Sequence, residues 1–173
     1  MLAFAQWLET TPIGVTIKSI NWVVPLVQSI HIVTIGIVFV SLLMIALRVL
    51  GLTRADQTFD AVMARFSPWI AKGLVVLLAT GLTLVLGEPI RELMSLSFWL
   101  KMGLLAIGVT SALSFSRSVA ARAIAAGGEP QFSMATKSAA MMTVLLWLAI
   151  IFLGRAIAYD VEVWGSLSLS PRA

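Results

Sequence analysis

The sequence predicts an all-α membrane protein, a bundle of four helices that cross the bilayer. The chain of 173 residues is 60% hydrophobic and only 12% charged, and its mean hydropathy is +1.00. Soluble domains carry about 25% charged residues, so lipid must replace water around part of this chain. The apolar stretches are long and continuous, whereas the strands of a membrane barrel alternate over about ten residues. Helices are therefore expected, because they satisfy their own backbone hydrogen bonds.

Four stretches are long enough to cross ~30 Å of hydrocarbon, which takes about 20 residues. We predict spans at approximately 22–49, 70–87, 96–117 and 138–159. Pro25 falls in the first turn of the first span, where its missing N–H is tolerated. Gly87 and Pro89 close the second span. Together the spans are expected to form a single integral membrane domain over residues 1–173.

Two further helices are predicted outside the spans. Residues 2–10 are apolar, but no basic segment precedes them and Glu9 interrupts the run, which favours a short interfacial helix over a secretory signal. In residues 53–66 the apolar side chains recur every three to four positions, at Phe59, Val62, Met63 and Phe66. This spacing predicts an amphipathic surface helix between the first and second spans.

The distribution of basic residues predicts the orientation. The loops after the first and third spans carry seven of them: Arg48, Arg54, Arg65, Lys72, Arg117, Arg122 and Lys137. The N-terminal segment, the middle turn and the tail carry three: Lys18, Arg91 and Arg172. Because positively charged loops stay in the cytoplasm, we expect a bacterial inner-membrane protein with both termini on the periplasmic side. The net charge of +4 then reflects orientation, and no nucleic-acid partner is expected.

Three basic side chains, His31, Lys101 and Arg155, lie inside the predicted spans. Because the helices alternate in direction, all three fall toward the same, non-cytoplasmic side. An unpaired ionisable group in hydrocarbon costs at least ~2.5 kcal/mol, so such groups are functional candidates. Gln28, His31 and Thr34 follow one another at intervals of three and form a polar stripe, which we expect to face the bundle interior.

Each of these groups also has a purely structural interpretation. His31 can form a hydrogen bond to a neighbouring helix, and Lys101 can extend to the membrane interface. Arg155 can do the same, or pair with Asp160 or Glu88. The second span offers small and hydroxyl residues, namely Thr80, Gly81, Thr83 and Gly87. They allow either close helix packing or room for a flat ligand.

The three basic groups suit a b-type haem. A neutral imidazole binds haem iron, a deprotonated amine can be a second axial ligand, and an arginine can hold a propionate. We therefore expect His31 and Lys101 as iron ligands, with Arg155 and Gln28 beside the cofactor. The absence of cysteine excludes covalently attached c-type haem, iron–sulfur clusters and disulfides.

Several short segments resemble segments of known protein families. They are Trp7-Leu8-Glu9-Thr10-Thr11-Pro12, Trp22-Val23-Val24-Pro25, His31, Arg48-Val49-Leu50-Gly51, Phe98-Trp99-Leu100-Lys101-Met102 and Gly154-Arg155-Ala156-Ile157-Ala158-Tyr159. Over most of its length the chain thus resembles an uncharacterised family of bacterial four-span membrane proteins. No activity is implied by this likeness.

The segments around His31 and Lys101 also resemble, more distantly, the small membrane protoporphyrinogen oxidases of haem biosynthesis, and more loosely the copper-resistance D-type membrane proteins. In the oxidase family, a histidine in the first conserved span and a lysine after an aromatic-rich start of a later span are the proposed haem ligands. The resemblance implies these roles for His31 and Lys101, and Pro68 also fits. The chain departs from the family at Leu42-Leu43-Met44 and Ser114-Phe115-Ser116, where the family has further polar residues and a histidine. The resemblance therefore implies haem binding more than the oxidase reaction.

Three functions are compatible with the sequence. The leading hypothesis is a b-type haem protein that transfers electrons or anchors a redox complex. The second is a cofactor-free accessory or structural subunit, and the third is a small oligomeric transporter that uses His31 and Lys101. The expected partners are the bilayer and either another membrane protein or further copies of this chain. A stand-alone enzyme is not favoured, because no hydrolytic motif is found; any catalysis would be that of a membrane oxidoreductase.

Overall fold

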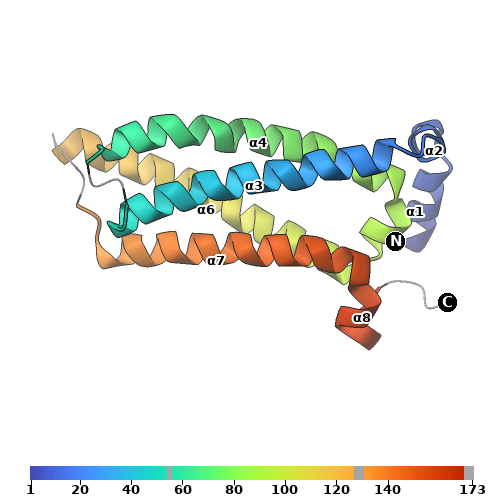
Figure 1. The fold of residues 1–173 in the computed structure, drawn as a ribbon. Coiled ribbons are helices and arrows are strands. Elements are labelled where there is room, and N and C mark those ends of the chain that lie inside the picture. The colour runs from blue at the N-terminus through green and yellow to red at the C-terminus, as the bar shows by residue number, and fades with distance from the viewer. Residues whose placement is uncertain (54–55, 127–130, 170–173) are drawn as a thin grey trace.

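Four long helices run side by side in the computed structural model, which describes residues 1–53, 56–126 and 131–169 (Figure 1). They are α3 (Val23–Leu50), α4 (Phe59–Gly87), α6 (Leu96–Ala126) and α7 (Met134–Ala156). The side chains of α6 are described as far as Ala112. No strand occurs within these ranges, so the predicted all-α class is confirmed for them.

Short helices cover one end of the bundle, which we call the α1 end. Here α1 (Leu2–Glu9) and α2 (Pro12–Ser19) lie across the long helices, and α5 (Pro89–Leu93) joins α4 to α6 (Figure 1). Helix α1 packs against α5, and α2 packs against α4. After α7, a 3-10 turn leads into α8 (Asp160–Trp164), which bends away from the bundle axis. The N-terminal segment thus contains the predicted helix and a second one.

The segment between the first and second spans differs from its prediction. The amphipathic helix expected at residues 53–66 and the span expected at 70–87 form one continuous helix, α4. Thr58 caps its start by accepting a hydrogen bond from the Ala61 N–H, at 3.2 Å. Pro68 lies inside this helix although it lacks an N–H. The helix continues because Val62 and Ile70, on either side of the proline, are both held against the same apolar cluster.

The long helices are suited to a bilayer. Three segments, α3, α4 and the stretch Met134–Leu167, are long and apolar enough to span it, and Leu96–Ala112 of α6 adds a shorter apolar helix. Only 17–22% of the most apolar part of each of the three segments is buried inside the protein. Lipid rather than protein must therefore cover most of this apolar surface, as in a multi-pass membrane protein.

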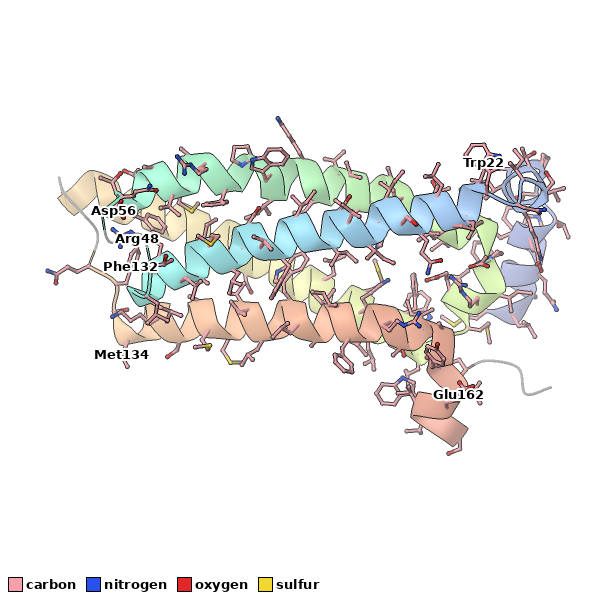
Figure 2. The ribbon with its side chains drawn as sticks, viewed as in Figure 1. Trp22, Arg48, Asp56, Phe132, Met134 and Glu162 are labelled. Carbon is pink, nitrogen blue, oxygen red and sulfur yellow. The ribbon has the colours of Figure 1, made fainter. Side chains whose placement is uncertain are left out.

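Two apolar clusters hold the helices together. At the end opposite α1, the basal cluster joins α3, α4 and α7 through Ile45, Ala46, Val49, Phe59, Val62 and Ala140. Figure 2 shows Phe132 beside this end, near Arg48 and Asp56, whereas Trp22 lies at the α1 end. The central cluster contains Val38, Trp147 and Ile150, and leucines of α4 and α6 pack against it.

Glycines allow the helices to approach closely at the central cluster. A Cβ added to Gly73 on α4 would collide with the Val38 side chain of α3. A Cβ added to Gly108 on α6 would lie 3.0 Å from Leu146 of α7. Small residues at these contacts bring the helix backbones together, as is typical of membrane helices.

Candidate functional site

Two turns above the central cluster, toward the α1 end, α3 and α4 meet again through polar residues. Val38 of α3 faces Gly73 of α4. On α3, His31 lies seven residues from Val38, and on α4, Gly81 lies eight residues from Gly73. Seven residues of α-helix span about 10.5 Å. A Cβ added to Gly81 would lie 3.6 Å from the His31 Cε1 atom, so the imidazole lies against this glycine.

Helices α6 and α7 repeat this arrangement at the same height. Gly108 of α6 lies beside Trp147, since a Cβ added there would be 3.9 Å from the indole Nε1. Lys101 lies seven residues before Gly108 on α6, and Gly154 lies seven residues after Trp147 on α7. Both steps lead toward the α1 end. A Cβ added to Gly154 would be 3.8 Å from the Lys101 Cδ atom. All four helices therefore contribute to one level, which we call the polar layer: His31, Thr80, Gly81, Lys101 and Gly154.

The hydrogen bond between His31 and Thr80 indicates which imidazole nitrogen carries the proton. His31 Nδ1 lies 2.7 Å from the Thr80 Oγ1 atom. The Thr80 hydroxyl has a single proton, which it donates to the backbone carbonyl of Val76 at 2.7 Å. With that proton on Val76, the Thr80 oxygen accepts from His31, and the neutral imidazole then carries its proton on Nδ1. The Nε2 atom is left with its lone pair, the form that binds a metal.

Lys101 is half-buried on α6, whereas His31 lies on α3. Its Nζ atom lies 5.5 Å from the centroid of the Phe98 ring, within the range of a cation–π interaction. The ammonium is close enough to interact electrostatically with His31 and with Glu92. Glu92 is buried on α5, where its carboxylate also accepts a hydrogen bond from Arg91 at 3.4 Å. The Phe98 ring is thus the aromatic neighbour of the amine, and the imidazole and the carboxylate lie within electrostatic range.

Arg155 and Gln28 do not join these two groups. Arg155 follows Gly154 and so has the same depth, but its guanidinium donates to the Tyr159 hydroxyl at 3.0 Å and lies over that ring. The side chain of Arg155 faces the outside of the bundle. Gln28 is half-buried one turn from His31, and no hydrogen bond of its side chain is found in the described part of the chain.

The acidic partners considered for Arg155 are engaged elsewhere. The Glu88 Oε2 atom lies 2.6 Å from the Arg91 Nη2 atom, and this ion pair is not aligned as a hydrogen bond. Asp160 is buried and accepts hydrogen bonds from the Ser95 hydroxyl at 2.7 Å and the Ser97 N–H at 3.0 Å. It also accepts from the Leu96 N–H and the Ser168 hydroxyl. Asp160 therefore anchors the start of α6, five residues before the helix reaches Lys101.

A match to a protein family covers the residues of this site. Residues 4–160 match the sequence profile of a family of unknown function, DUF6644. The chain belongs to this family. The match is compatible with the predicted resemblance to an uncharacterised membrane-protein family, and the DUF6644 region contains every residue of the polar layer and Asp160. No curated protein and no solved structure matches the chain significantly.

Proposed function

We propose that this DUF6644 protein binds a b-type haem in the polar layer, with His31 as the first iron ligand. The supporting observation is the hydrogen bond from His31 to Thr80, which leaves the lone pair on Nε2. A haem-binding histidine commonly donates its other ring N–H in this way, because the bond fixes the ring and strengthens the ligand. The distant resemblance to the small membrane protoporphyrinogen oxidases supports the same position.

Lys101 is the proposed second ligand. It lies at the height of His31 on a different helix, and Gly154 packs against its stem. An ammonium has no lone pair, so Lys101 would have to release a proton before it could bind a metal. Gly81 lies beside the imidazole as Gly154 lies beside the lysine. Neither position carries a side chain that would fill the layer.

A bound haem would supply one-electron transfer. The residues of the chain would orient and enclose it, and the depth of the layer would keep it away from water. In this proposal the protein transfers electrons within the bacterial inner membrane or anchors a partner redox complex there, with the α1 end on the periplasmic side. Another membrane protein or a second copy of the chain would receive the electrons.

The test is a haem titration of the full-length protein purified in a neutral detergent. The wild-type protein is expected to develop a Soret band, which His31→Ala abolishes. Thr80→Val removes the acceptor for the His31 N–H and should weaken haem binding about 10–100-fold. Thr80→Ser keeps the acceptor and should bind like wild type. Thr83→Val is the matched control, because within the described part of the chain the Thr83 hydroxyl bonds only to the Ala79 carbonyl, one turn away.

Lys101→Met tests the second ligand. Loss of the amine should shift the Soret maximum and remove the low-spin bands, while haem remains bound through His31. A wild-type protein that stays colourless throughout the titration would refute the proposal and favour the accessory-subunit function. Haem binding that is equal in wild type and His31→Ala would refute the assignment of the site.

A further inference from the structure

The outward face of α4 carries an aromatic and basic stripe that the haem proposal does not use. Arg65, Trp69 and Lys72 are spaced four and three residues apart, and at 3.6 residues per turn they fall within an arc of about 60°. All three are exposed, and 56% of the Trp69 surface is accessible. We call these three residues the α4 stripe.

The positive charge of the α4 stripe is not compensated within the protein. Neither Arg65 nor Lys72 has an ion pair or hydrogen bond to any part of the chain that the structure describes. Asp60 lies on the same helix, but it is five residues before Arg65 and therefore about 140° around the axis. Two cations thus flank an exposed indole and lack an anionic partner.

The α4 stripe also marks a change in the chemistry of the helix surface. Toward the basal end, the exposed positions include Asp60, Arg65 and Pro68. Beyond Lys72 no charged residue occurs as far as Gly87, and exposed valines such as Val75 continue the surface. A face that changes from charged to apolar at a Trp and a Lys is typical of a membrane–water interface.

We propose that Arg65, Trp69 and Lys72 form a binding face for the phosphate headgroups of anionic phospholipids. The guanidinium and the ammonium can each bind a phosphate oxygen, and the indole suits the boundary between headgroups and acyl chains. The face is continuous with the lipid-exposed surface of α4, which identifies a lipid rather than a soluble molecule as the occupant. The proposal does not depend on haem.

The experiment compares binding of phosphatidylglycerol and phosphatidylcholine to the full-length protein in neutral detergent, measured by native mass spectrometry. The wild-type protein should bind phosphatidylglycerol more tightly. Each basic residue near a headgroup is expected to contribute about fivefold, so Arg65→Gln/Lys72→Gln should lose about 30-fold in phosphatidylglycerol affinity. Its affinity for phosphatidylcholine should change less than twofold.

The matched control is Lys18→Gln/Arg155→Gln, which removes the same charge at the α1 end and should keep wild-type affinity. An equal loss in this control would overturn the proposal, because net charge rather than the α4 stripe would then attract the lipid. Equal binding of the two lipids by wild type would also overturn it and favour an acidic protein as the occupant. If the double variant melts earlier than wild type without lipid, the two single variants provide the same comparison, each with about a fivefold loss.

Discussion

The basal cluster and the polar layer are built on the same helices and lie about 21 Å apart along α3, from Ile45 to His31. In the basal cluster the side chains are apolar and tightly enclosed, and Phe59 is only 1% exposed. In the polar layer His31, Thr80 and Lys101 all remain half-buried, and two glycines replace side chains. One end of the bundle is thus tightly packed with apolar side chains, while the other holds polar groups that the protein encloses only in part.

The largest effect that would test this division is expected for Phe59→Ala. The ring is buried and meets the Phe132 ring edge-on, with the two centroids 5.0 Å apart. Its removal should lower the free energy of unfolding by about 3–5 kcal/mol, measured by thermal denaturation in detergent. Haem affinity should stay within twofold of wild type. Phe152→Ala, at a position 82% exposed, is the control and should change stability by less than ~0.5 kcal/mol.

A smaller effect, extending into the region of the polar layer, is expected for Asp160→Ala. This substitution removes the charged acceptor of two N–H groups and one hydroxyl at the start of α6, and of the Ser168 hydroxyl near the C-terminus. We expect a loss of about 2–3 kcal/mol in the free energy of unfolding, and a shifted Soret band because α6 carries Lys101. Glu162→Ala, an exposed acid on the same short helix, is the control. Equal stabilities of the two variants would show that Asp160 does not anchor α6.

The smallest effect is expected for Arg155→Gln. The guanidinium is exposed and bonded to Tyr159 on its own helix, so its loss should change stability by less than ~0.5 kcal/mol. Haem affinity should also stay within twofold of wild type, whereas Lys101→Gln, which removes the same charge, should alter the spectrum. A loss of haem affinity in Arg155→Gln would instead support the propionate role that the sequence suggested, and would extend the polar layer to the outside of α7.

The long helices were predictable because each depends on a local property, the length of an apolar run. The start of α4 was harder to predict. Apolar residues on both sides of Pro68 pack into one cluster, and this long-range contact merges two predicted helices into α4. A proline and nearby charges argue for a break when the sequence is considered alone. The second N-terminal helix, which begins at Pro12, was not predicted either.

The site was predictable only in part, for a similar reason. Helix direction and depth placed His31 and Lys101 at one level, and the structure brings them there. Which partner a polar group selects depends on rotation about the helix axis, and spacing alone does not define that rotation. From the sequence, Thr80 could be named only as one of several small or hydroxyl residues. The structure shows that it is the hydrogen-bond partner of His31. Asp160 was considered for Arg155, although it bonds to residues more than sixty positions earlier.

The continuity of α4 has a mechanical consequence. A helix of 29 residues is a rod about 43 Å long, and it carries Trp69 and Thr80 on the same rigid body. If Trp69 follows the headgroups when the bilayer thins or thickens, a tilt or slide of α4 would also move the Thr80 hydroxyl that lies beside His31. Under the α4-stripe proposal, the thickness of the surrounding lipid would therefore be coupled to the geometry of the His31 imidazole.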